Sequence, residues 1–170
     1  MFVSEFHGSE TVQLTVAAPD VFDLLVDVDR LPKWNAHIHH VIQQPGRPLA
    51  EGVEWVIQTR AMGARWPSRA RALTIDRAGL PFEHRPCSDD GNPSYALWSW
   101  QVTSEPPGST LTVTWAAHPR SFWRKLWLAR LGGPYSQGGQ SLAGRLGRLP
   151  AHRRTGRRRP HSLTFGEIHP

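Results

Sequence analysis

Six segments with the residue pattern of β-strands follow one another between positions 39 and 117 of this 170-residue chain. Short turn-forming stretches separate them, among them Pro45-Gly46, Met62-Gly63 and Asp90-Gly91-Asn92-Pro93. Strands joined by such short links pair with their sequence neighbours in antiparallel fashion. We therefore predict an antiparallel meander built from residues 39–44, 53–60, 65–77, 81–86, 94–104 and 109–117.

One more strand and two short helices are predicted ahead of the meander. Residues 9–17 alternate roughly between polar and apolar side chains, as expected for a half-buried strand. Pro19 and Asp20 then suit the first turn of a helix, and apolar residues recur at helical spacing as far as Val28. Residues 29–35 are predicted to form a second short helix or turn.

The chain changes character after a final predicted helix at residues 121–131. Residues 1–131 carry 13 Lys and Arg against 13 Asp and Glu, whereas residues 132–170 carry seven arginines and one glutamate. Glycine and proline at 132–134 would stop the helix. We therefore divide the chain into a neutral folded domain, 1–131, and an Arg/Gly/Pro-rich tail, 132–170. The composition of the tail is typical of a disordered segment or of a frame-shifted C-terminus.

Several classes of protein are excluded by composition. Cys87 is the only cysteine, so neither an intramolecular disulfide nor a zinc site of several thiolates is possible. The first 19 residues lack the pattern of a signal peptide. The chain also has no run of 18 apolar residues, which a membrane-spanning helix would require. We expect a cytoplasmic protein with no membrane span, no metal and no cofactor. The basic tail has no interleaved aromatic residues, so we expect incidental polyanion binding and no specific nucleic-acid partner.

Residues 17–25, Ala-Ala-Pro-Asp-Val-Phe-Asp-Leu-Leu, and residues 27–35, Asp-Val-Asp-Arg-Leu-Pro-Lys-Trp-Asn, resemble the opening of polyketide cyclase/dehydrase-like proteins. Residues 52–55, 98–102 and 108–115, followed by Pro119, are similar to the later strands of that family. The family belongs to the SRPBCC, or START-like, superfamily, which includes the steroidogenic-regulatory lipid-transfer domains. The resemblance extends over about residues 9–131.

This resemblance implies an α+β helix-grip fold. In that fold a curved antiparallel sheet of seven strands wraps around a C-terminal helix, in the order β-α-α-β6-α. Members of the family range from aromatase/cyclases to ligand carriers, so the resemblance is more specific for fold than for chemistry. The chain departs from the family where the last helix should be long, because its helical pattern stops at Leu131.

Tryptophan is unusually abundant, with eight residues, six of which lie on or beside elements expected to face the interior. Indole rings provide an apolar wall for a planar ligand, although ordinary core packing is the alternative for each of them. Trp98 and Trp100 are two residues apart on a predicted strand and therefore share a face. The predicted ligand cavity is lined by Trp34, Trp55, Trp66, Trp98, Trp100, Trp115 and Phe122.

A cyclase or dehydratase would also need a general base, for which histidine is the natural choice. His84, in the middle of a predicted strand, and its neighbour Arg85 are weak catalytic candidates, and a satisfied or exposed histidine is the alternative. Arg69 and Arg71 fit a solvated strand face, and the histidines at 37, 39 and 40 fit a surface cluster better than a metal site. We therefore predict binding or transport of a hydrophobic small molecule, aromatic polyketide-like or lipid-like. A polyketide cyclase/dehydratase-type enzyme that uses a cavity histidine or arginine for proton transfer is the alternative.

Overall fold

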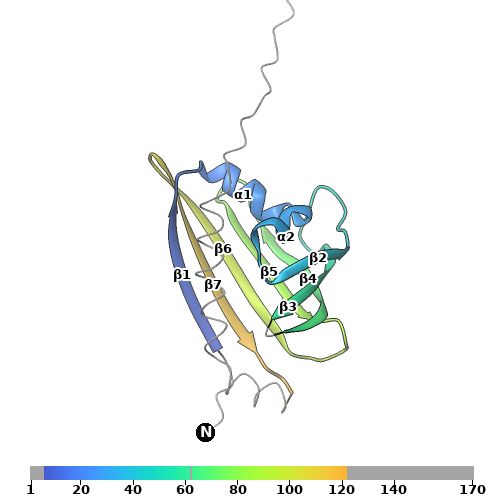
Figure 1. The fold of residues 1–170 in the computed structure, drawn as a ribbon. Helices are drawn as coiled ribbons and strands as arrows, with labels where there is room; N and C mark the ends of the chain where they lie inside the picture. The colour runs from blue at the N-terminus through green and yellow to red at the C-terminus, as the bar shows by residue number, and fades with distance from the viewer. Residues whose placement is uncertain (1–5, 62, 122–170) are drawn as a thin grey trace, which may run out of the picture.

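The computed structural model describes residues 6–61 and 63–121. Within them the chain forms one curved antiparallel sheet of seven strands, with two short α-helices at one end of it (Figure 1). The helical elements are α1 (Ala18–Val26), the 3-10 turn η1 (Val28–Arg30) and α2 (Leu31–Trp34). The strands are β1 (Phe6–Leu14), β2 (Ile38–Gln43), β3 (Glu54–Ala61), β4 (Ala64–Ile75), β5 (Pro81–Ser88), β6 (Tyr95–Glu105) and β7 (Gly108–His118).

The strands lie in the order β1-β7-β6-β5-β4-β3-β2. Strands β2 to β7 thus form the predicted meander, and β1 completes the sheet by pairing with β7. All seven predicted strands are confirmed, with ends that differ by up to three residues. The largest difference is in β1, which ends at Leu14 because the chain leaves the sheet there to enter α1. The predicted helix at 121–131 and the tail at 132–170 lie outside the described residues.

The two faces of the sheet differ in their side chains: one carries the buried core and the other carries most of the charged residues. Residues directly opposite each other on neighbouring strands point to the same face, so the pairing register assigns each side chain to a face. The inner face, which packs with α1 and α2, carries the buried core, including Trp55, Trp100 and Leu111. The outer face carries most of the charged residues of the strands, such as Arg69, Arg71 and Arg85.

Helix α1 covers part of the inner face, because its sequence combines a favourable helix start with apolar residues on one side. Pro19 lies in its first turn with Asp20, where a fixed φ and a negative charge both favour a helix start. Its buried residues, spaced three or four apart, pack against β5, β6 and β7. The chain then turns through η1 into α2, which positions Trp34 over the sheet.

Candidate functional site

A continuous row of ring contacts crosses the inner face from β3 to β7. The ring centroid of Trp55 on β3 lies 5.9 Å from that of His84 on β5, which lies 6.4 Å from Trp100 on β6. Trp98 stacks on Trp100 and Trp115, with centroid separations of 5.9 and 5.8 Å. These rings, together with Trp34 and Phe82, are called the aromatic row: Trp34, Trp55, Phe82, His84, Trp98, Trp100 and Trp115.

Small residues on β4 allow the two halves of this row to meet. Trp55 pairs with Ala70 across one side of β4, and His84 pairs with Ala72 across the other. Both alanines are 1% exposed. Because a methyl group rises little above the sheet, the rings of β3 and β5 reach each other over β4. A larger residue at either position would separate them.

Trp34 covers the row from the helical side. Its ring meets that of Trp100 edge-on, with a centroid separation of 6.0 Å and an interplanar angle of 84°. His84 stacks on Phe82, two residues earlier on the same strand, at 5.2 Å. Edge-on and stacked arrangements are both favourable for aromatic pairs. The row is therefore a packed aromatic layer with rings in both orientations.

The row holds buried polar atoms for which the described residues provide no hydrogen-bond partner. Nε1 of Trp34, Trp55 and Trp100 and Nδ1 of His84 make no hydrogen bond within the part of the chain that the structure describes. Burial lowers the pKa of His84 to about 4, so the imidazole is neutral near pH 7. The aromatic row thus presents three N–H donors and one neutral imidazole, and it carries no charge.

The structure brings together five of the predicted cavity tryptophans, Trp34, Trp55, Trp98, Trp100 and Trp115, and adds His84 to them. Trp66 shares the inner face, opposite Thr59, but makes no ring contact with another described aromatic residue. Phe122 lies outside the described residues.

Arg85 is not part of this arrangement. It pairs with Arg71 across β4 on the outer face, and its exposed guanidinium lies 5.5 Å from the ring centroid of Tyr95. Consecutive strand residues point to opposite faces, so His84 and Arg85 cannot both face the aromatic row. The candidate role of Arg85 at the inner site therefore does not agree with its position.

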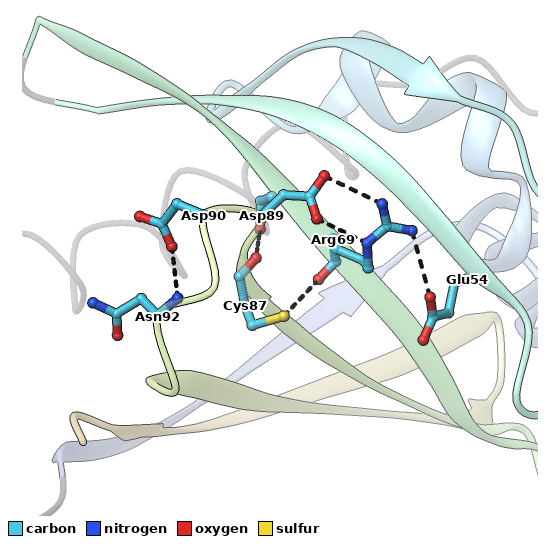
Figure 2. A network of polar contacts seen from close by, with 7 residues as sticks. Glu54, Arg69, Cys87, Asp89, Asp90 and Asn92 are labelled. Carbon is cyan, nitrogen blue, oxygen red and sulfur yellow. Dashed lines mark hydrogen bonds and ion pairs between the residues drawn. The ribbon is translucent and has the colours of Figure 1, made fainter. Parts of the chain in front are cut away.

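The outer face of β4 and β5 carries a polar network (Figure 2). Arg69 donates to both carboxylate oxygens of Asp89 at 2.8 and 3.2 Å, and it lies 3.5 Å from Glu54. The thiol of Cys87 donates to the backbone oxygen of Arg69 at 3.5 Å, and burial raises its pKa. Arg69 and Arg71 thus lie on a solvated strand face, as their alternation indicated, and Cys87 has the surroundings of an unreactive thiol.

Two histidines of the predicted surface cluster, His39 and His40, lie on the edge strand β2, whereas His37 precedes this strand and is half-buried. The rings of His39 and His40 are exposed and in contact, with centroids 5.1 Å apart. Among the described residues, no group of three His, Cys, Asp or Glu side chains could hold a metal ion.

Sequence reasoning missed two inner-face residues. Glu10 lies opposite Val113 on the inner face and is half-buried, and Phe82 is fully buried beside His84. The signal was present in both cases. Glu10 shares the period of two with Val12 and Leu14, and Phe82 shares it with His84. Alternation divides the side chains of a strand into two sets, but it does not show which set faces inward. That assignment requires the pairing register with the neighbouring strands.

A comparison with protein-family models matches residues 5–147 to the family described as polyketide cyclase / dehydrase and lipid transport. The chain belongs to this family. The match spans every described strand and helix, and it agrees with the resemblance seen in residues 17–35. Among curated proteins, no relative matches the sequence.

Solved structures agree with this family fold. The Zhui aromatase/cyclase from a Streptomyces species has a TM-score of 0.69 and 13% identity, with 84% of this chain and 91% of that chain covered. A START superfamily protein from Mycobacterium smegmatis has a TM-score of 0.65 and 14% identity, with 83% and 97% covered. A Thermobifida fusca protein solved by NMR has a TM-score of 0.58 and 21% identity, with 88% and 97% covered. At these identities the likeness shows the fold, which is the predicted START-like helix-grip class.

Family and fold together fit either the binding of a hydrophobic ligand or a cyclase-type activity. Neither the family nor the fold identifies the role of this chain more closely. The described helices include none with the length and apolar character needed to cross a membrane.

Proposed function

We propose that the aromatic row is the binding surface for a hydrophobic small molecule, and that the protein binds or carries this molecule rather than transforming it. The observation that supports the proposal is the unbroken succession of ring contacts across the inner face from β3 to β7, with rings from four of these strands. Such a layer offers an extended π surface on which a flat or apolar ligand can stack. Trp66, on the same face, extends the surface toward one end of β4.

The catalytic alternative has less support from the geometry. A general base is normally held in place by a second hydrogen-bonding group, which also selects its tautomer. The Nδ1 atom of His84 has no such partner within the described residues. The other candidate, Arg85, lies on the outer face. The inner face therefore offers an aromatic surface with one neutral imidazole, and no described residue forms a hydrogen bond with the Nδ1 atom of that imidazole.

Intrinsic tryptophan fluorescence tests the proposal. Polycyclic aromatics, flavonoids and fatty acids would be titrated into the purified protein. We expect saturable quenching or a blue shift with a midpoint in the micromolar range for at least one class. No saturable response to any class would refute the proposal.

Two variants on β6 locate the binding surface. Trp98 and Tyr95 are both half-buried, and they lie on the inner and outer faces of the same strand. We expect Trp98→Phe to weaken binding several-fold, because it removes part of the stacking surface, and Tyr95→Phe to leave binding unchanged. Equal effects of the two substitutions would place the ligand elsewhere.

A further inference from the structure

The edge strand β2 contains a β-bulge at its two adjacent histidines. Ile38 lies opposite Thr59 and His40 lies opposite Gln58, so two steps along β2 correspond to one step along β3, and His39 is the extra residue. Neighbouring residues of a regular strand point to opposite faces, whereas a bulge re-aims a side chain. The Nδ1 atoms of His39 and His40 lie 3.1 Å apart, so both rings are on the same side of the strand. The bulge thus brings two imidazoles together.

Two arginines lie on the same face of the sheet as this pair. His40 shares the outer face with Gln58, and Arg60 is two residues further along β3 on that face, directly opposite Arg65 on β4. Like charges directly opposite each other destabilise a sheet. The Nε atom of Arg60 donates to the backbone oxygen of Ala36 at 3.0 Å, which restrains this guanidinium. The arginine pair is therefore held in place in spite of its repulsion.

The four basic groups act on one another without an acidic neighbour. The positive charge of Arg65 lowers the pKa of His39 most, and partial desolvation, His40 and Arg60 lower it further. No carboxylate is among these groups, and neither arginine forms an ion pair with a carboxylate of the described residues. Helix α2, which packs against β2, adds Lys33 as its only charged residue. His39, His40, Arg60 and Arg65 are called the basic cluster.

The histidine pair can gain a protonation state that suits an anion. Its Nδ1–Nδ1 hydrogen bond needs one ring to donate and the other to accept. While the pair is neutral, the donating ring has no proton on its Nε2 atom. Once that ring is protonated, both Nε2 atoms carry a proton and the pair has one positive charge. Both rings are exposed, so these N–H groups are open to a ligand.

We propose that the basic cluster binds a tetrahedral oxyanion with two negative charges, such as a phosphate group. The two guanidinium groups and the two Nε2–H groups donate to its oxygens, and its charge offsets the repulsion between Arg60 and Arg65. This site lies on the outer face at the β2 edge of the sheet (Figure 1), whereas the aromatic row lies on the inner face. The proposal therefore does not depend on the proposed function.

Sulfate titrations at pH 6 and pH 8 test the site. Sulfate keeps both negative charges over this range, so a change in affinity reports on the protein. We expect the NMR signals of the two histidine rings to shift saturably with sulfate at pH 6. Binding takes up a proton, so affinity should be at least about threefold weaker at pH 8. Chloride at equal ionic strength is the control and should give no saturable shift. The absence of saturable sulfate binding at pH 6 would overturn the proposal, and equal affinities at both pH values would contradict the part assigned to the histidines.

Three substitutions assign the binding to these residues. Arg65→Gln should weaken sulfate binding about fivefold and raise the pKa of His39, because it removes the charge that lowers this pKa most. His39→Gln should remove the pH dependence and leave weaker binding. Arg71→Gln, at an exposed position on the same face of β4, is the matched control and should change neither property. Equal effects of the two arginine substitutions would indicate general attraction to a basic surface and would refute the proposal.

A lipid probe separates a free ion from a lipid headgroup. Vesicles of phosphatidylcholine that contain phosphatidate display the same phosphate group on a surface, and pure phosphatidylcholine vesicles are their control. Vesicle binding that Arg65→Gln weakens would show that a headgroup reaches the site. Sulfate binding without vesicle binding would restrict the site to free ligands. Both results support an anion site, whereas vesicle binding that Arg65→Gln leaves unchanged, with no binding of sulfate, would overturn it.

Discussion

Trp115 on β7 lies across Gly8 on β1, so closely that a Cβ atom added to Gly8 would stand 2.2 Å from the indole ring. Atoms of real side chains do not approach each other at that distance. The indole therefore fills the place of the side chain that β1 lacks. This is how the aromatic row extends to the edge strand of the sheet.

We expect Gly8→Ala to displace Trp115 and to disturb its stacking on Trp98. Overpacking of this kind destabilises a protein by about 1–3 kcal/mol. Urea unfolding would measure the loss, and near-UV circular dichroism would report the change in the tryptophan stack. Gly46→Ala is the matched control, because nothing lies within 4 Å of the position of its Cβ. Equal effects of the two substitutions would contradict the assigned contact.

His84 should make stability depend on pH. Its pKa is about 4 in the folded state and 6.5 in the unfolded chain. Between these values the unfolded state binds a proton that the folded state does not, so stability is lost as pH falls from 6.5 to 4. The expected loss is about 3 kcal/mol.

Urea unfolding of the wild type and of His84→Phe at pH 7, 5.5 and 4.5 would measure this effect. The variant keeps a ring in the aromatic row and cannot titrate, so the stability difference between the two proteins should move in its favour as pH falls. A constant difference would show that His84 is accessible to protons in the folded protein.

Cys87 should react slowly with alkylating reagents. Its thiol is half-buried and bonded to the backbone oxygen of Arg69, and burial raises its pKa, so little thiolate is present at pH 7.5. We expect iodoacetamide to modify the native protein at least about tenfold more slowly than the protein unfolded in urea. Because Cys87 is the only cysteine, mass spectrometry measures both rates at one site. Equal rates would contradict the assigned environment.

Ser109 links β7 to the connection between β1 and α1. Its side chain is 2% exposed, and its hydroxyl donates to the backbone oxygen of Val16 at 2.7 Å. Ser109→Ala leaves that carbonyl without its partner and should destabilise the protein by about 1–3 kcal/mol. Ser9→Ala, at an exposed position of β1, is the control and should have little effect in the same urea titration. A Ser109→Ala protein as stable as the control would mean that water replaces the bond.

The strands could be predicted because their information is local. Alternation and turn residues located all seven strands, and a period of two placed Trp98 and Trp100 on one face, where their rings stack. The contact between Trp55 and His84 could not be predicted in the same way. It depends on the alanines of an intervening strand and on two pairing registers. The position of Arg85 on the outer face could not be predicted either, because it depends on the pairing of β5 with β4.

The pairing of β1 with β7 has a consequence for synthesis of the protein. Thr11 and Thr112, whose hydroxyl groups are hydrogen-bonded across this pair, are 101 residues apart in the chain. As the polypeptide leaves the ribosome, β1 emerges long before the strand that will hold it. Contacts of such long range slow folding, because the ends of the loop must meet before the contact contributes any stability. Until β7 is translated, β1 is therefore unpaired, and its apolar side chains Val12 and Leu14 remain available for aggregation.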